Sequence, residues 1–219
     1  MLLYAITNRK LLAGDEAERC RRLVELAAVW ARGGVEYIQV REKDMPLNEL
    51  QPLAARVAGG VRDAGGSARV VVNGPAQVAL DAGADGVHLH SGMGAAAVRA
   101  AHQVYDRAGR EAIVSVACHS PEEIREAAGA SMLLFSPIFE KVTEPRSLRG
   151  QGLGALRRAA ELAAPMPVFA LGGVTERNAA ACVQAGAAGV AAIRLFLGGA
   201  WRGLTGAEAD TSASVRPSS

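Results

Sequence analysis

Residues 82–90 read AGADGVHLH, and residues 185–193 read AGAAGVAAI. Both stretches pass from a glycine-containing turn into a short apolar run, which is the pattern of a helix end followed by a buried strand. The two copies precede the fourth and the eighth of eight short apolar runs. Their likeness indicates either duplication of half of the fold or one kind of helix-to-strand turn that uses the same residues twice. The eight runs span residues 2–7, 35–40, 69–73, 86–90, 112–117, 131–136, 167–172 and 189–194.

Longer stretches rich in alanine and leucine separate these runs, and residues 15–32, 46–64 and 175–185 have the length of helices. Strands that alternate with helices predict a parallel sheet. Eight such units in little more than 200 residues predict an α/β fold, a single (β/α)8 TIM barrel. A doubly wound open sheet is the alternative, but it usually has a glycine-rich nucleotide turn after its first strand, whereas residues 7–14 read TNRKLLAG.

The composition fits one globular domain, because half of the 219 residues are hydrophobic and 21% are charged. We expect the barrel over residues 1–203 and a disordered tail over residues 204–219, which are small and polar. The formal net charge is only +2, and no apolar run is long enough to cross a bilayer, so we expect neither nucleic acid nor a membrane as partner. Three widely spaced cysteines fit neither a disulfide framework nor a zinc site. We therefore expect a cytoplasmic protein.

Polar residues gather where the second strand is predicted to end. In a parallel barrel the active site lies at the C-terminal ends of the strands, and successive side chains alternate between the two faces. If Ile38 and Val40 face the helices, Gln39 and Arg41 point into the barrel, and Lys43 follows on the loop. Because unpaired buried charges are costly, we predict that Gln39, Arg41 and Lys43 bind an anionic ligand, with a salt-bridged barrel interior as the alternative.

Three histidines follow the fourth and fifth predicted strands. His88 and His90 share one face of the fourth strand, but no third ligand is visible nearby, so we predict that they line the site and bind no metal. His119 ends the fifth strand. Imidazole suits proton transfer at neutral pH, which makes His119 the candidate general acid–base.

The last three strand ends also carry candidate ligands. The sixth strand runs into SPIFEKVTEPRSLRGQGLG (136–154), a long segment of mixed charge that contains Glu140 and Lys141, and segments of this length in a compact barrel are usually functional. The seventh strand ends in Gly172 and Gly173, and the eighth ends at Arg194. These two strand ends usually form the phosphate-binding part of a TIM barrel. We therefore predict that Gly172, Gly173 and Arg194 bind a phosphate group.

With these residues assigned, the sequence resembles the superfamily of thiamine phosphate synthase and the TenI thiazole tautomerases. The resemblance covers residues 3–196, nearly the whole predicted barrel. It is carried by YAITNR (4–9), YIQVREKD (37–44), VVNG (71–74), DGVHL (85–89), SVACHS (115–120), SPIFEK (136–141), PVFALGGVTERNA (167–179) and AGAAGVAAI (185–193).

Within this superfamily, the synthase couples hydroxymethylpyrimidine diphosphate to thiazole phosphate and releases diphosphate. The resemblance implies that Arg41, Lys43 and Asn73 bind the diphosphate. It also implies a Mg²⁺ ion held by acidic residues, but Gly74 and Met93 stand where the synthase pattern has aspartate. Neither supplies the hard oxygen ligand that Mg²⁺ needs. We therefore predict no metal site and no certain cofactor, with Mg²⁺ only if the chain acts as a synthase.

The TenI group acts on one substrate, a thiazole phosphate that it aromatises by a proton shift. Because the acidic metal ligands are missing and His119 is present, the sequence favours this tautomerase over the synthase. A non-catalytic binder of thiazole phosphate or thiamine phosphate is the third alternative. In each case the partner is a small phosphorylated molecule, with Glu140 and Lys141 as further contacts and a homodimer as the expected assembly.

Overall fold

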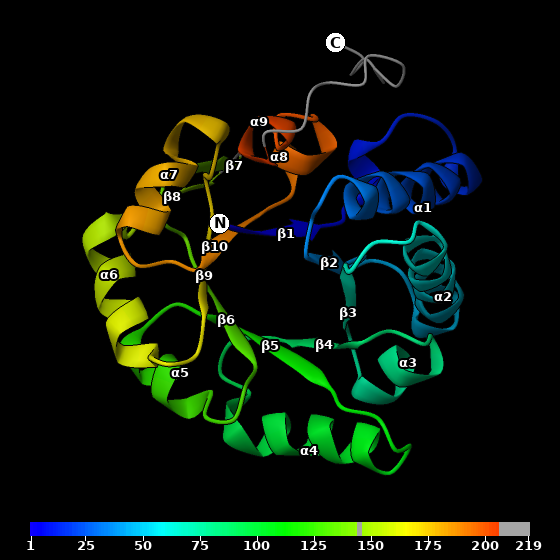
Figure 1. Ribbon diagram of the computed structural model, residues 1–219, viewed down its shortest axis with the longest axis horizontal. Coiled ribbons are helices and arrows are strands. Elements are labelled where there is room, and N and C mark those ends of the chain that lie inside the picture. The colour runs from blue at the N-terminus through cyan, green and yellow to red at the C-terminus, as the bar shows by residue number, and fades with distance from the viewer. Residues whose placement is uncertain (144–145, 206–219) are drawn as a thin grey trace.

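The computed structural model describes residues 1–143 and 146–205, and for residues 141–143 and 146–148 it describes the backbone alone. Eight parallel strands close into a barrel, and helices surround it (Figure 1). Neighbouring strands follow the chain order, and the first pairs with the last. The predicted TIM barrel is therefore confirmed. Its strands are β1 (Leu2–Ile6), β2 (Tyr37–Val40), β3 (Arg69–Asn73), β4 (Gly86–Leu89), β5 (Ile113–Cys118), β6 (Met132–Phe135), β9 (Val168–Leu171) and β10 (Gly189–Ala192).

The predicted apolar runs differ from these strands by no more than two residues at either end. The helices between the strands also follow the predicted pattern, for example over residues 16–32 against a predicted 15–32. The helical elements are η1 (Arg9–Leu11), α1 (Glu16–Arg32), α2 (Leu47–Asp63), α3 (Ala76–Asp81), α4 (Gly94–Asp106), α5 (Pro121–Glu126), α6 (Gly152–Ala163), α7 (Glu176–Gln184), α8 (Arg194–Leu197) and α9 (Arg202–Thr205).

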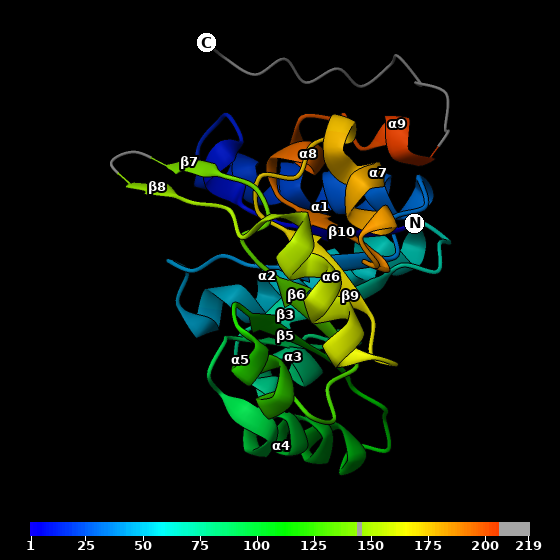
Figure 2. The same cartoon turned by 90° about the vertical axis from the view of Figure 1, so that its left-hand side faces the viewer.

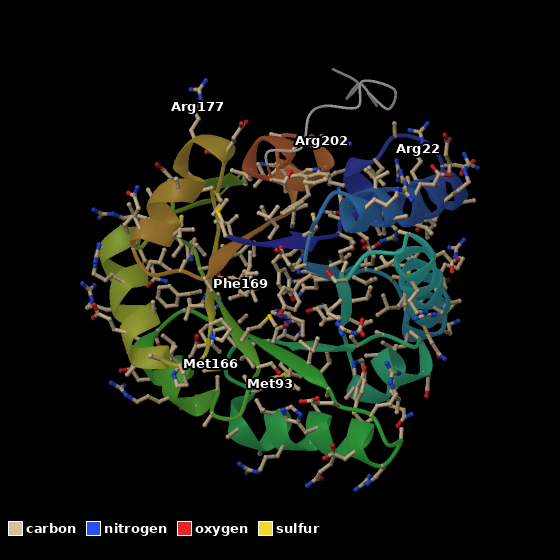
Figure 3. All side chains as sticks on the ribbon, in the orientation of Figure 1. Arg22, Met93, Met166, Phe169, Arg177 and Arg202 are labelled. Carbon is tan, nitrogen blue, oxygen red and sulfur yellow. The ribbon has the colours of Figure 1, made fainter. Side chains whose placement is uncertain are left out.

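Alternation along the strands produces two separate apolar cores. Outward-facing residues such as Leu3 and Val70 pack with the helices in a large cluster. Inward-facing residues form a smaller cluster inside the barrel, which includes Tyr4, Val71 and Phe169. The Tyr4 and Phe169 rings meet edge to face with centroids 5.5 Å apart, and Figure 3 shows Phe169 within the ring of strands. The barrel is thus filled by side chains along its length, as expected for eight strands.

Steric contact explains why the second glycine of the repeated turn, Gly86 or Gly189, has to be glycine. At Gly86, the first residue of β4, a Cβ atom would lie 1.8 Å from the Ile113 carbonyl oxygen on β5. At Gly189, which begins β10, it would lie 2.0 Å from the Leu2 carbonyl oxygen on β1. Neither position has room for a side chain. The close approach of neighbouring strands therefore accounts for the two matching glycines without a duplication of half the barrel.

A short hairpin interrupts the segment after β6. The sequence predicts a long loop here, but β7 (Lys141–Thr143) and β8 (Arg146–Leu148) pair as antiparallel strands, with Lys141 opposite Leu148. Figure 2 shows this hairpin projecting from the barrel. Strands of only three residues leave too short an alternation to be recognised in the sequence.

The C-terminal part of the predicted domain ends in α9, which includes Leu204 and Thr205. These two residues belong to the predicted tail, and the rest of that tail, residues 206–219, lies outside the described residues. Among the described helices, none has the length and hydropathy required of a membrane span.

Candidate functional site

A chain of four polar side chains crosses the interior of the barrel. The Gln39 amide donates to the Tyr4 hydroxyl at 3.4 Å, the Tyr4 and Ser115 hydroxyls are 3.1 Å apart, and the Ser115 hydroxyl lies 2.9 Å from Nδ1 of His88. All four residues are buried. Gln39 therefore points inward as predicted, and in this structure its amide bonds to protein rather than lying exposed.

His88 is neutral in this environment. Burial lowers its pKa to about 3, and the charges of His90 and Arg41 act in the same direction. The ring is therefore a hydrogen-bonding group at neutral pH and not a cation. His90, one residue beyond β4, is exposed, so the two histidines lie in different surroundings although they were predicted to line the site together.

Arg41 is partly buried, and its guanidinium group has no partner among the described residues. Its backbone N–H donates to the Thr7 hydroxyl at 2.9 Å. Its guanidinium group forms no hydrogen bond or ion pair with the residues that the structure describes. Desolvation lowers the pKa of Arg41, and the neighbouring Glu42 charge opposes this effect in part. A half-buried cation of this kind is stabilised when an anion binds to it.

Glu42 lies on the opposite side of the same segment and is saturated with hydrogen bonds. Its carboxylate accepts the Thr7 hydroxyl at 2.6 Å and the Arg9 backbone N–H at 3.1 and 3.2 Å. The Arg9 guanidinium adds an ion pair at 3.0 Å. The Glu42 side chain is 1% exposed. The Glu42 carboxylate is therefore held on the side of Arg9, whereas the Arg41 guanidinium group does not pair with it.

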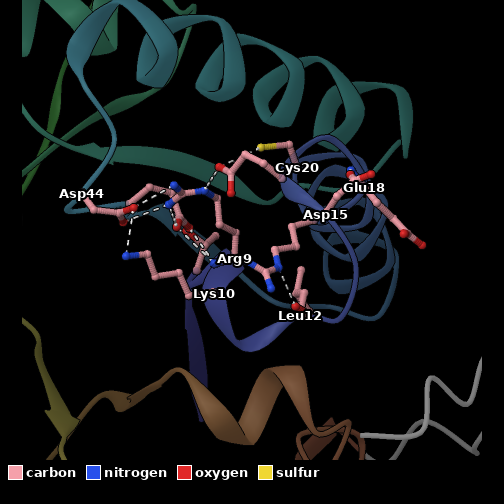
Figure 4. Close-up of polar contacts among 11 residues, drawn as sticks. Arg9, Lys10, Leu12, Asp15, Glu18, Cys20 and Asp44 are labelled. Carbon is pink, nitrogen blue, oxygen red and sulfur yellow. Dashed lines mark hydrogen bonds and ion pairs between the residues drawn. The ribbon is translucent and has the colours of Figure 1, made fainter. Parts of the chain in front are cut away.

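Arg9 is the centre of an ion-pair cluster that joins the loops after β1 and β2, and we call it the Arg9 network (Figure 4). Besides Glu42, its guanidinium group binds both carboxylate oxygens of Asp44, at 3.0 and 2.8 Å, and its Nε donates to Glu16. Lys10 also pairs with Asp44, at 3.1 Å. Arg9 is only 5% exposed. The sequence analysis missed this network, although the alternating charges of residues 41–44 were a signal for it.

Asn73 ends β3 next to Arg41 and His88. Its Cα pairs with that of His88, and the preceding pair in the β2–β3 register is Val40 with Val72. The Asn73 amide oxygen is buried and has no hydrogen-bond partner among the described residues. An orphaned buried acceptor of this kind requires a donor from a ligand or solvent, which supports the prediction that Asn73 lies at a binding site.

The donor set at the ends of β3 and β4 does not fit a magnesium ion. Gly74 follows Asn73, and Met93, which is 47% exposed, precedes α4. No group of three or more His, Cys, Asp or Glu side chains suited to a metal ion occurs in the described part of the chain. Glu42 and Asp44, the acidic side chains of the β2 loop, are engaged by Arg9. We therefore assign no residues to a Mg²⁺ ion.

His119 is exposed at the end of β5, and the β6 loop fixes the orientation of its ring. Its Nδ1 lies 2.8 Å from the Ser136 carbonyl oxygen and therefore carries the proton, which leaves Nε2 as an acceptor. The His119 backbone N–H donates to Glu123 at 2.5 Å, and Gln151 donates to the His119 carbonyl oxygen at 3.1 Å. The ring is thus held in the tautomer that a general base requires.

The two glycines after β9 pack tightly against the β6 loop. A Cβ atom at Gly172 would lie 2.8 Å from Pro137 Cα, and one at Gly173 would lie 2.7 Å from Phe139 Cβ. Both glycines have positive φ, at 94° and 66°. This packing is a reason for the Gly-Gly pair that sequence reasoning did not identify. Phosphate binding by Gly172 and Gly173 stays a prediction.

The remaining predicted contacts lie at the same end of the barrel. Arg194 is exposed and begins α8, directly after β10. Glu140 is exposed, and its carbonyl oxygen lies close to Gly173. Lys141 begins β7, and its side chain is outside the described part. The predicted site residues therefore lie at or near the ends of seven strands, which is the usual construction in this fold.

Two cavities occur at the opposite end of the barrel. One of 240 Å³ is lined by residues that precede β3, β4 and β5, among them Arg69, Asp85 and Arg110. Another of 290 Å³ lies beside the start of β9 and is mostly apolar. Arg69 already pairs with Asp85, at 3.1 Å, and Arg110 donates to the Ala84 carbonyl oxygen. These cavities are separate from the candidate site.

The fold and the strand-end residues define a (β/α)8 barrel with cationic and amide groups at the carboxyl ends of its strands. Residues 3–196 match the model of the family described as thiamine monophosphate synthase. The chain belongs to this family.

Known relatives agree with this assignment. A Geobacter sulfurreducens protein named "Putative thiamine-phosphate synthase" is 37% identical over 199 residues, which cover 89% of this chain and 86% of that protein. The thiamine-phosphate synthase of Methanoculleus marisnigri is 33% identical and covers 98% of this chain and 92% of its own. The solved structure of a thiamine phosphate pyrophosphorylase from Pyrococcus furiosus is 28% identical, with a TM-score of 0.70, and the match covers 94% of this chain and 88% of that one.

These relatives support the enzyme class and the superfamily that the sequence predicted. They favour the synthase, which the sequence analysis held as the alternative, and they do not support the tautomerase that it preferred. The sequence favoured the tautomerase because aspartate is absent at positions 74 and 93, although Arg41, Lys43 and Asn73 match the synthase pattern. Small-molecule substrates agree with the family, whereas the homodimer stays a prediction.

Proposed function

We propose that this protein is a thiamine-phosphate synthase that couples hydroxymethylpyrimidine diphosphate to thiazole phosphate. In this reaction the bond between the pyrimidine methylene carbon and the diphosphate oxygen breaks. Diphosphate leaves with the electron pair, and the lone pair of the thiazole nitrogen forms the new carbon–nitrogen bond. The observation that carries the proposal is the half-buried Arg41 guanidinium group, which has no partner among the described residues.

The chemistry explains why such a cation is useful. Negative charge builds up on the diphosphate as its bond to carbon breaks, so a preorganised cation stabilises the transition state more than the ground state. Arg41 has the planar fork that matches phosphate oxygens. Lys43 follows two residues later, and Asn73 lies at the end of the neighbouring strand. We assign these three residues to the diphosphate.

The thiazole phosphate would lie at the ends of β9 and β10. Gly172 and Gly173 there adopt backbone conformations with positive φ, and Arg194 adds a positive charge. Arginine binds phosphate through charge-assisted hydrogen bonds. We assign Gly172, Gly173 and Arg194 to this phosphate, with Glu140 and Lys141 on the adjoining loop.

His119 distinguishes the synthase from the tautomerase. The bond exchange of the coupling reaction transfers no proton, so a general base is not required for it. The tautomerase reaction is a proton shift, and the accepting Nε2 of His119 is the observation that favours it as a second candidate. In the synthase, His119 would contact substrate and would not exchange protons with it.

Two assays on the same preparation test the proposal. The purified protein should form thiamine phosphate from the two substrates, and Arg41→Met should lower kcat/KM. His119→Ala should lower the coupling rate by less than about tenfold, because general acid–base catalysis usually contributes 10²–10⁴-fold. Absence of thiamine phosphate, with and without Mg²⁺, would refute the synthase. Turnover of the thiazole tautomer phosphate that depends on His119 would then establish the tautomerase, and binding without either turnover would establish a non-catalytic binder.

A further inference from the structure

Residues 41–44 carry charges of alternating sign, which raises the question of which of these charges pair with each other. Arg41 is followed directly by the carboxylate of Glu42, and Lys43 by that of Asp44. In a partly desolvated site, opposite charges so close together normally pair with each other. Here Glu42 and Asp44 instead bind Arg9, which comes from the loop after β1. Some feature of the structure must therefore keep Glu42 away from the Arg41 guanidinium group.

Arg9 is that feature, because it donates to both carboxylates, with Thr7 as a further donor to Glu42 and Lys10 as a further partner of Asp44. Both Glu42 oxygens accept hydrogen bonds from the Arg9 backbone or side chain, at 3.0–3.2 Å. Both Asp44 oxygens accept from the guanidinium fork, at 3.0 and 2.8 Å. Five donors in a fixed plane make this double occupation feasible, and a lysine ammonium cannot reproduce it.

We propose that Arg9 is a positioning residue for diphosphate binding: it holds Glu42 and Asp44 on one side of the β2 loop and so keeps Arg41 available to the anion on the other side. Arg9 has no contact with substrate in this account and acts through Arg41. The inference rests on the proposed function in taking diphosphate as the anion.

The experiment measures binding of inorganic diphosphate by calorimetry, so it does not depend on turnover. Arg9→Lys keeps the positive charge but lacks the planar guanidinium group that donates to Glu42 and Asp44. It should weaken diphosphate binding about tenfold or more, because the released carboxylates can then compete for Arg41. Arg22→Lys is the matched control. Arg22 pairs with Glu18 at 2.6 Å on the same helix as Glu16, and lies outside the network. This control should bind within about twofold of the unaltered protein.

A rescue variant separates positioning from a general structural role. If Glu42 captures Arg41 once Arg9 is weakened, Arg9→Lys combined with Glu42→Gln should recover binding to within about threefold of the unaltered protein. A purely structural role for Arg9 predicts that the second substitution weakens binding further, since Glu42 loses its own hydrogen bonds. Circular dichroism and thermal unfolding confirm that each variant is folded. If Arg9→Lys does not fold, Glu42→Gln alone should bind diphosphate at least as tightly as the unaltered protein.

The outcomes are distinguishable from failure of the proposed function. Equal diphosphate affinity in Arg9→Lys and the unaltered protein, or failure of the rescue, overturns the inference alone. If the protein binds diphosphate but does not couple the two substrates, the proposed synthase function is overturned. The role of Arg9 is then still decided by the diphosphate affinities of the Arg9→Lys and rescue variants. If the unaltered protein binds no diphosphate, both are overturned.

Discussion

Arg9 and Arg41 lie at the same end of the barrel, and replacement of each by methionine should shift the unfolding temperature in opposite directions. Arg9 is 5% exposed and binds three carboxylates. Arg41 is half-buried, and its guanidinium group has no partner among the described residues. Loss of Arg9 leaves the buried Glu42 carboxylate without its ion-pair partner, whereas loss of Arg41 removes a charge whose desolvation disfavours folding.

The structure gives the size of each effect. Removal of one partner of a buried ion pair costs about 3–5 kcal/mol. Glu16 and Asp44 are 54% and 40% exposed and can return to water, so only Glu42 is left buried. The lower value, about 3 kcal/mol, therefore applies to Arg9→Met, and for a domain of this size it lowers Tm by about 6–12 °C. For Arg41→Met we expect a gain of at most about 1 kcal/mol, which raises Tm by about 0–4 °C.

Activity should fall in the more stable variant. A hydrogen bond between charged groups contributes about 1.5–3 kcal/mol, so the loss of one from Arg41 to the leaving diphosphate lowers kcat/KM by about 10- to 150-fold. Thermal unfolding and the coupling assay are measured on the same samples at pH 7.5. A Tm lowered by more than about 2 °C in Arg41→Met would show that its guanidinium group is paired in the folded protein. An unchanged kcat/KM would show that it does not bind the substrate.

Three further predictions concern pH, packing and metal dependence. Burial lowers the pKa of His88 in the folded protein to about 3, from 6.5 in the unfolded chain. The stability of the fold with neutral His88 is therefore fully present above pH 6.5. Between pH 6.5 and pH 3 the free energy of unfolding should fall by about 1.4 kcal/mol for each pH unit. Thermal unfolding at pH 7 and pH 5 should show this loss in the unaltered protein and in the control His102→Asn, at a half-buried position on α4, but not in His88→Asn. Gly86→Ala places a Cβ 1.8 Å from a carbonyl oxygen and should destabilise by more than about 2 kcal/mol, whereas Gly59→Ala, in α2 with open space around it, should stabilise by about 0.5–1 kcal/mol in urea unfolding. Because glycine and methionine replace the two acidic ligands, a chelator should lower kcat/KM less than about tenfold, and a larger loss would reveal oxygen ligands from elsewhere in the chain.

The sequence predicts the barrel well because each strand has its own local signature. Apolar runs bounded by glycine at 86 and 189 mark strand starts, and the parity argument correctly places Gln39 inside the barrel. The interior hydrogen-bond chain could not be predicted from the sequence. Tyr4 and Ser115 lie within apolar runs, and their partners lie on strands that are distant along the chain. Closure of the barrel brings β1, β4 and β5 to a common axis, and no local pattern encodes that distance.

The Arg9 network shows the same limit at the candidate site. Arg41 and Glu42 follow directly after β2 (Tyr37–Val40), and their opposite charges can be read from the sequence. The partner of Glu42 comes from a different loop, 33 residues earlier. A run of alternating charges is compatible with solvent exposure, with pairing inside the run or with pairing to another segment. Only the position of Arg9 beside the β2 loop distinguishes these alternatives.

The loss of the acidic metal ligands has a simple electrostatic consequence. Two carboxylates and one divalent cation have a summed charge of zero, so a site that lacks all three has the same net charge towards an incoming diphosphate as a site that has them. What such a site lacks is a Lewis acid directly on the phosphate oxygens. Without such a Lewis acid, stabilisation of the leaving group would rest on Arg41, Lys43 and Asn73, the residues that we assign to the diphosphate. A guanidinium group that acts without a metal beside it has to be kept free of competing carboxylates, and this is the task that we propose for the Arg9 network.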